Sequence, residues 1–306
     1  MKEDTAGDPI SGLKWTHKSL RKIKTVLDKK GYPLSPPTIS RLLRERDYSL
    51  QVNHKCIASK QYPDRDKQFR YLSRWRQMYL RFGFPVISVD AKKTEKIGNF
   101  KNSGQAWCQK RRDVNMYDFP NLAQGKAIPY GIYDIGQNQG FVSIGISHNT
   151  AEFATATIRS WWTKKGQKDY PETSHLLIDA DSGNPNSCRS RVWKKGIQEL
   201  ADEFKIIITV THYPTGASKW NPIEHRMFSL ISANWAGKPL DSYEMILNHI
   251  RTTTSTTGFQ CQAQLDTSEY KLKQKVADRD FKTLSIRHHK HLPQWNYSIY
   301  PRFPQP

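Results

Sequence analysis

Cysteine is scarce in this sequence of 306 residues, which contains only Cys56, Cys108, Cys188 and Cys261. None of them forms a CxxC pair, so the sequence predicts neither a disulfide framework nor a zinc site, and the thiols are typical of a reducing cytosol. Long hydrophobic runs are missing too, since the longest, such as residues 206–208, are the size of a strand. We therefore expect a cytoplasmic protein without a membrane-spanning helix or a secretory signal.

Acidic residues are few relative to basic ones. The chain has 28 Asp and Glu against 48 Lys and Arg, which gives a net charge of +20. With 37% hydrophobic and 25% charged residues, the composition is that of a globular protein. The excess of positive charge favours a polyanionic partner, of which nucleic acid is the commonest. It is densest in residues 1–85, which carry 19 Lys and Arg against 8 Asp and Glu.

The N-terminal segment, residues 1–62, has the pattern of two short helices joined by a turn. Thr16 is a candidate N-cap of the first helix, Gly31 ends it, and Ser35 before two prolines begins the second. The expected second helix places Ile39, Leu42 and Leu43 inward and Ser40, Arg41, Arg44 and Arg46 outward. This pattern predicts a helix-turn-helix that binds DNA through Arg41 and Arg44. A small helical bundle with an ordinary solvated basic face fits the pattern equally well.

The rest of the chain predicts a connecting helix followed by an α/β domain. Residues 63–84 form an amphipathic stretch that we interpret as a structural strut. From residue 85 to 255, strand-like runs at 86–89, 128–135, 141–146, 176–178 and 206–210 mix with helical stretches at 150–165, 189–204, 222–235 and 242–252. This order predicts a mixed sheet with helices on its faces. Residues 256–306 form a polar C-terminal extension, in which the histidine-rich run 288–291 is interpreted as a solvated basic loop rather than a metal site.

Three carboxylates stand where a sheet can gather them. Asp90 ends the first strand, Asp181 follows the 176–178 strand, and Glu224 opens the helix after the last strand. Each also has a structural interpretation. Asp90 fits a solvated turn, Asp181 an Asx-turn, and Glu224 a helix-capping position three residues after Asn221. Asp179 is a rival to Asp181 because it lies on the same face of an extended segment.

The order of several motifs resembles the ISAzo-thirteen-like insertion-sequence family, whose members are DDE transposases with a ribonuclease-H-like core. The resemblance covers most of residues 7–301. It rests on the segments 86–93 (VISVDAKK), 98–102 (GNFKN), 118–120 (DFP), 125–131 (GKAIPYG), 188–191 (CRSR), 218–225 (SKWNPIEH) and 234–240 (NWAGKPL). The stretch Asn221–Glu224 also resembles the last acidic motif of mariner-type transposases.

The resemblance implies a function and a site. Asp90, Asp181 and Glu224 become the catalytic triad, although Ser182 stands where the family pattern has a glycine. The triad would hold two divalent ions, Mg²⁺ or Mn²⁺ as its substitute, which prefer oxygen ligands and serve both oxygens of an in-line phosphodiester displacement. Water would first cut DNA at the element's ends, and the freed 3′-hydroxyl would then attack target DNA. The implied partners are the terminal repeats, target DNA and further copies of the chain on paired ends, and the expected location is the bacterial nucleoid.

Other residues near the triad have less specific expected roles. Lys92 and Lys93 are candidates for holding a phosphate or are simply an exposed basic turn, while Lys219 and His225 flank Glu224. Trp220 fits either core packing, which we favour, or stacking on a base.

Compared with the family pattern, the chain is also expected to be truncated at its N-terminus. Two alternative functions remain open at this point. One is a catalytically inactive DNA-binding protein, and the other is a ribonuclease-H-like nuclease that cuts without strand transfer.

Overall fold

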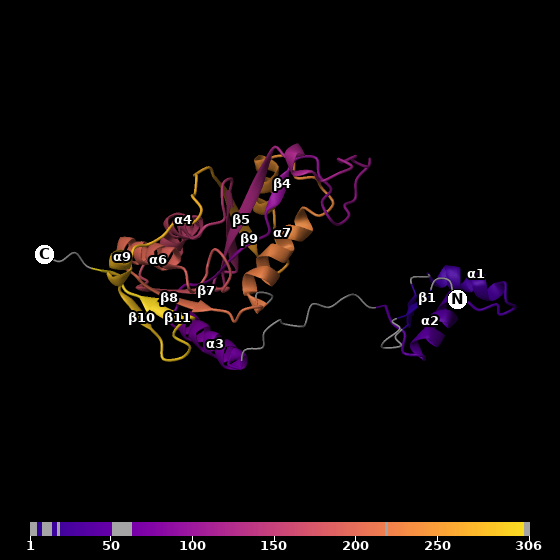
Figure 1. Ribbon diagram of the computed structural model, residues 1–306, viewed down its shortest axis with the longest axis horizontal. Coiled ribbons are helices and arrows are strands. Elements are labelled where there is room, and N and C mark those ends of the chain that lie inside the picture. Colours follow the sequence, from indigo (N-terminus) through magenta and orange to yellow (C-terminus); the bar gives the residue numbers. More distant parts are fainter. Residues whose placement is uncertain (1–4, 8–13, 17–18, 51–62, 218–219, 303–306) are drawn as a thin grey trace. The chain divides into compact units, whose positions relative to one another are not determined.

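The computed structural model describes residues 5–7, 14–16, 19–50, 63–217 and 220–302. The chain divides into two compact units, residues 1–57 and residues 58–306, which are described separately (Figure 1). No helix among the described residues is both long and apolar enough to cross a membrane.

The N-terminal unit contains two short helices, as the sequence predicts. Strand β1 (Thr5–Gly7) pairs antiparallel with β2 (Lys14–Thr16), and helices α1 (Leu20–Asp28) and α2 (Pro36–Arg44) follow. Ser35 caps α2 as expected, but α1 is capped by Ser19 instead of Thr16, because Thr16 belongs to β2. The two nine-residue helices bury only a narrow apolar seam, which includes Ile23 and Ile39. Leu42, expected to face inward, is exposed.

The second unit is built on a mixed sheet that contains all the predicted strands. The central strands are β3 (Val86–Ala91), β5 (Gly125–Asp134), β6 (Gln139–Gly145), β7 (His175–Ala180) and β8 (Ile207–His212). They lie in the order β6-β5-β3-β7-β8, in which β5 is antiparallel to both β3 and β6 while β3, β7 and β8 are parallel. The first strand of the unit is thus central, with the second and third on one side and the fourth and fifth on the other. This topology confirms the expected ribonuclease-H-like α/β fold.

Helices cover both faces of the sheet. On one face, α4 (Ala151–Trp161), its continuation through η3 (Trp162–Gly166) and α5 (Gln167–Asp169), and α6 (Arg191–Phe204) enclose the larger core. On the other, η5 (Glu224–Phe228), α7 (Ser229–Asn234) and α8 (Tyr243–Arg251) enclose a second core. The two cores use alternate residues of β5, such as Tyr130 and Tyr133, as expected of a strand buried on both sides.

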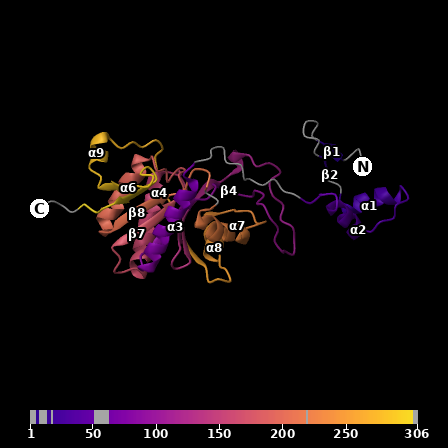
Figure 2. The same cartoon turned by 90° about the horizontal axis from the view of Figure 1, so that it is seen from below.

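Helix α3 (Arg65–Arg81), the predicted connecting helix, packs along the sheet (Figure 2). Leu72 lies against Tyr213, and Tyr79 lies against Val86. The buried amide of Gln68 donates hydrogen bonds to the carbonyl of His212 at 2.9 Å and to the side chain of Asn296 at 2.8 Å. Helix α3 is therefore part of the second unit's core as well as a connection.

The C-terminal residues, which the sequence led us to treat as an extension, contribute strands to the same sheet. Strand β9 (Gln260–Asp266) extends it parallel to β6, β11 (Asn296–Ile299) pairs with β8, and β10 (Ile286–His288) pairs with β11. Strand β4 (Glu95–Ile97) pairs antiparallel with β5. Two short helices, η2 (Pro120–Leu122) and α9 (Asp278–Lys282), lie in connections between strands. Within the histidine-rich run, His289 accepts or donates a hydrogen bond with the hydroxyl of Tyr71 and stacks on Trp75 at 4.8 Å. The interpretation of this run as a solvated loop was therefore wrong for His289.

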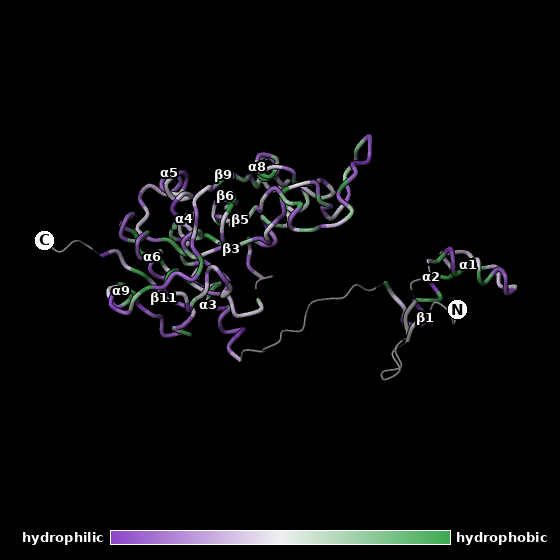
Figure 3. The backbone as a smooth tube through the Cα atoms, turned by 45° about the horizontal axis from the view of Figure 1, so that its top comes forward, coloured by the Kyte–Doolittle hydropathy of each residue, from purple (hydrophilic) through white to green (hydrophobic). Residues whose placement is uncertain are grey.

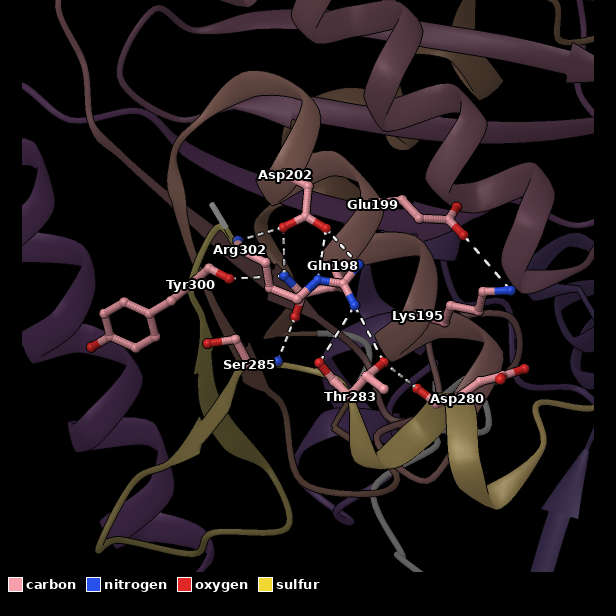
Figure 4. A network of polar contacts seen from close by, with 9 residues as sticks. All are labelled: Lys195, Gln198, Glu199, Asp202, Asp280, Thr283, Ser285, Tyr300 and Arg302. Atoms are coloured by element: carbon pink, nitrogen blue, oxygen red, sulfur yellow. Dashed lines mark hydrogen bonds and ion pairs between the residues drawn. The ribbon is translucent and has the colours of Figure 1, made fainter. Parts of the chain in front are cut away.

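A network of hydrogen bonds joins residues 300–302, which follow β11, to helix α6 (Figure 4). The guanidinium of Arg302 donates to the carboxylate of Asp202 at 2.6 and 3.0 Å, and the backbone amide of Arg302 donates to the same carboxylate. Burial alone would raise the pKa of Asp202, but these hydrogen bonds lower it below its usual value. Nearby, the Gln198 side chain bonds the carbonyl of Tyr300 and the amide of Ser285. These contacts hold the segment after β11 in place.

Candidate active site

Asp90 and Asp181 meet at the carboxyl ends of two neighbouring parallel strands. The register of β3 and β7 aligns Val89 with Ala180. The residue that follows each of them is one of the two carboxylates, Asp90 after Val89 and Asp181 after Ala180. Asp90 is 6% exposed, and its Oδ1 accepts the backbone N–H of Ala91 at 2.7 Å. The sheet thus brings together two residues that are far apart in the sequence.

Glu224 reaches the same region because the start of its helix is attached to β3. The amide of Asn221 donates to the carbonyl of Val89 at 3.2 Å, next to Asp90. The hydroxyl of Ser88 donates to the Asn221 side-chain oxygen and accepts the backbone N–H of Ile223 at 3.1 Å. Asn221 directly precedes the first helical residue, Pro222, as expected of an N-cap, but its side chain binds the strand and Ser88 accepts the N–H of Ile223 in its place. Sequence reasoning missed Ser88, which lies in the same motif as Asp90.

A glycine on the neighbouring strand lets this helix approach the sheet. Gly131 lies opposite Asp90 in the β3–β5 register. A Cβ at Gly131 would overlap the Met227 methyl group and lie 2.7 Å from the Phe228 ring. Both side chains are buried in the helix that begins at Glu224. Gly131 is therefore required for the close packing that places Glu224.

The three carboxylates share an electrostatic environment that disfavours their charged forms. Burial and then the proximity of Asp181 and Glu224 raise the pKa of Asp90 to about 8. Burial raises the pKa of Asp181 as well. Burial and Asp181 raise the pKa of Glu224, although His225 and Lys92 oppose the change. A positive charge placed between these groups would relieve the repulsion.

Within the part of the chain that the structure describes, the carboxylates do not form a closed coordination shell, but one of their buried oxygens lacks a hydrogen-bond partner. Asp181 Oδ1 is buried and has no hydrogen-bond partner among the described residues, although the side chain of Asn186, whose amide nitrogen is also unpaired, lies close enough to lower the pKa of this carboxyl. A buried carboxylate oxygen without a donor is costly in a folded protein, and a metal ion is one group that would satisfy it. Among the same residues, no three Asp, Glu, His or Cys side chains are gathered closely enough to hold an ion by themselves. An all-oxygen set with open positions suits Mg²⁺ or Mn²⁺, which retain water and also bind substrate phosphate.

Asp179, the rival of Asp181, is fully engaged elsewhere. It is completely buried, and its Oδ2 accepts from Arg76 Nε at 3.0 Å and Nη2 at 2.6 Å. Its Oδ1 accepts from the hydroxyl of Thr211 at 2.6 Å. Arg76 also donates to the hydroxyl of Tyr213 at 2.6 Å. Both carboxylate oxygens of Asp179 are thus satisfied, whereas Asp181 has one that is not.

The lysines after Asp90 have different environments. Lys92 is only 11% exposed; its Nζ lies 3.0 Å from Glu95 and 4.6 Å above the Trp235 ring. Lys93 is 72% exposed and lies 3.4 Å from the same Glu95 carboxylate. An exposed basic turn therefore describes Lys93 but not Lys92. Glu95, which holds both lysines, had no signal in the sequence beyond its charge.

The remaining predicted residues lie in several places. Lys219 lies outside the described residues. Arg41 and Arg44 are exposed on α2 of the N-terminal unit, where Arg41 pairs with Glu45. Trp220 is 44% exposed and lies under the guanidinium of Arg65 at 4.5 Å, so the core position that we favoured for it was wrong.

The ribonuclease-H-like sheet, with acidic residues at the ends of its first and fourth strands and in the helix after its fifth, defines the class of DDE-type phosphodiester-transfer enzymes. The chain belongs to the family described as "Rhodopirellula transposase DDE domain", whose model matches residues 1–301. It is accordingly an insertion-sequence DNA transposase of the DDE class. A comparison with curated protein sequences found no significant match.

Three solved structures of Mos1 transposase are among those similar to this chain. The paired-end complex with the left transposon end is 15% identical, covers 79% of this chain and 70% of that chain, and has a TM-score of 0.45. The Mos1 paired-end complex with Mg is 14% identical, with coverages of 79% and 71% and a TM-score of 0.45. The Mos1 strand transfer complex is 13% identical, with coverages of 79% and 70% and a TM-score of 0.44.

Proposed function

We propose that Asp90, Asp181 and Glu224 are the catalytic carboxylates of this transposase, and that they act with two divalent ions, Mg²⁺ or Mn²⁺. The reactions are hydrolysis of a phosphodiester at each element end and attack of the freed 3′-hydroxyl on target DNA. The observation that supports the proposal is the position of Asp90 and Asp181, each directly after the in-register pair Val89 and Ala180, together with a buried Asp181 oxygen that lacks a hydrogen-bond partner among the described residues.

Bound ions would activate the attacking hydroxyl and neutralise charge on the leaving oxygen. The chain's own residues would prepare the site. Asp90 and Asp181 supply oxygen ligands from the rigid ends of β3 and β7. Glu224 supplies a third from a helix that Asn221 and Ser88 fix to β3. Lys92, largely covered beside Trp235 and close enough to Glu224 to oppose the rise in its pKa, contributes positive charge near the incoming phosphate.

The proposed partners are the element's terminal repeats and target DNA. The net charge of +20 supports binding to a polyanion, and the exposed arginines of α2, Arg41 and Arg44, are the proposed contacts of the N-terminal unit. Paired-end complexes are named among the Mos1 structures, and by analogy we propose that copies of this chain assemble on two ends. The proposed location is the bacterial nucleoid, where this DNA resides.

Incubation of the full chain with a labelled duplex that carries an element end tests the proposed function. With Mg²⁺ or Mn²⁺ we expect new 3′ ends at one position and products in which these ends are joined to a second DNA. Removing the metal with EDTA should abolish both products without preventing DNA binding. Cutting without joining would favour a nuclease, and binding without cutting in either metal would favour an inactive DNA-binding protein.

A further inference from the structure

Two of the motifs that carry the family resemblance supply no carboxylate to the active site, and they contact each other. They are residues 98–102 and 234–240. The amide of Asn102 donates to the carbonyl of Trp235 at 3.0 Å, and the backbone N–H of Gly237 donates to the carbonyl of Ser103 at 2.9 Å. The backbone N–H of Gly98 donates to the carbonyl of Leu240 at 2.8 Å. The loop between β4 and η2 is thus docked on the turn that follows α7.

Glycines make this docking possible. Gly104 and Gly237 both have positive φ, at 101° and 71°. A Cβ at Gly104 would lie 2.6 Å from the Cβ of Ala236, and one at Gly237 would lie 3.0 Å from the Cα of Gln105. A side chain at either position would therefore force the loop away from the turn. The base of the loop is therefore held in one position against the turn that follows α7.

The docked loop and helix α8 border a cavity of about 1070 Å³ that is rich in positive charge. The loop projects from the second unit (Figure 1) and is largely hydrophilic (Figure 3). We call this cavity the loop–α8 cleft. Its lysines and arginines are Lys101, Lys110, Arg111, Arg112 and Lys238, and its one acidic lining residue among the described residues is Glu244.

Much of this charge is not neutralised within the chain. Arg111 pairs with Asp113, and Arg112 pairs with Asp241. The other three basic side chains form no ion pair among the residues that the structure describes; they are Lys101, Lys110 and Lys238. Beside them, Trp107 is fully exposed. Unpaired lysines interspersed with an exposed aromatic ring are typical of a surface that binds nucleic acid.

We propose that the loop–α8 cleft binds the phosphate backbone of the duplex that is being cleaved, with the Trp107 ring against a nucleotide. This inference rests on the proposed function and adds a second DNA contact to it. The helix that begins at Glu224 continues as α7 to Asn234, which lines the cleft, so the cleft and the active site share one helical element.

The triple variant Lys101→Ala, Lys110→Ala, Lys238→Ala tests the proposal. Its matched control is Lys271→Ala, Lys275→Ala, Lys282→Ala, which removes the same charge from exposed lysines elsewhere on the second unit. Binding of the full-length chains to an element-end duplex is measured over a range of salt concentrations. We expect the cleft variant to bind at least tenfold more weakly, with a salt slope smaller by about two to three, and the control to differ by less than half as much. Equal slopes for the two variants would overturn the proposal.

A second measurement uses the cleft's own thiol. Cys108 lines the cleft and is exposed, whereas Cys188 and Cys261 are buried. Duplex DNA should slow alkylation of Cys108 by iodoacetamide at least tenfold in the unmodified chain, as followed by peptide mass spectrometry, and should slow it much less in the triple variant. An unchanged rate would refute the cleft as a DNA site. Metal-dependent cleavage by the triple variant, measured at a protein concentration that saturates the DNA, tests the carboxylates independently of the cleft. Failure of the cleft proposal can therefore be distinguished from failure of the proposed active site.

Discussion

Replacement of Asp90 by Asn is expected to abolish DNA cleavage, lowering its rate by about a thousandfold or more, while DNA affinity stays within about twofold of the unmodified chain. Asn keeps the shape of the side chain and can still accept the N–H of Ala91, but it lacks the negative charge that a metal ligand needs. Rates are measured on an element-end duplex with Mg²⁺, and affinities without metal.

The same substitution is expected to leave the protein at least as stable as before. Asp90 is buried beside Asp181 and Glu224, and a neutral amide removes this repulsion. The matched control is Asp278→Asn, which changes an exposed carboxylate far from the site in sequence and should cleave normally. An Asp90→Asn chain that cuts at the unmodified rate would show that the site is assigned wrongly. A loss of cutting accompanied by unfolding would contradict the electrostatic account of Asp90.

Replacement of Arg76 by Met is expected to lower the free energy of unfolding by about 3–5 kcal/mol, because it leaves Asp179 buried and unpaired. Asp179 is completely buried, and Arg76 is 23% exposed, so water cannot replace the guanidinium on the strand side. The loss is measured by urea denaturation followed by tryptophan fluorescence.

The double variant Arg76→Met, Asp179→Asn separates this explanation from a simple packing defect. Because Asp179→Asn removes the buried charge, it should restore at least about 1 kcal/mol of the free energy of unfolding that Arg76→Met loses. If the double variant is less stable than Arg76→Met alone, the ion pair is not the source of the effect. A loss below about 1 kcal/mol for Arg76→Met would likewise contradict it.

The part of the fold that the sequence predicts is the part encoded by apolar runs. The strand containing Val86–Val89 and the strand containing Leu176–Ile178 are recognised because their side chains are buried on both faces of a sheet. Strand β9 was missed because its sequence, QCQAQLD, is polar and lies at the edge of the sheet. Strand β11 is too short for a periodic pattern, although it is fully buried.

The sequence predicts which residues carry the carboxylates of the site, but not the residues that hold those carboxylates in position. Nothing local in the sequence indicates that Ser88 contacts Asn221, which is 133 residues away. Nothing local in the sequence indicates either that Arg76 forms an ion pair with Asp179, which is 103 residues away. These contacts depend on how α3 and the helix of Glu224 pack on one face of the sheet. The choice between Asp179 and Asp181 is for that reason a question of tertiary structure.

The most direct test of the account compares Asp181→Asn with Asp179→Asn in the cleavage of an element-end duplex, at a temperature where both variants are folded. With Mg²⁺ or Mn²⁺, the Asp179→Asn chain should produce 3′ ends at the same position as the unmodified chain, because Asp179 serves the ion pair with Arg76. The Asp181→Asn chain should produce none. Cleavage that survives in Asp181→Asn and is lost in folded Asp179→Asn would contradict the proposed active site.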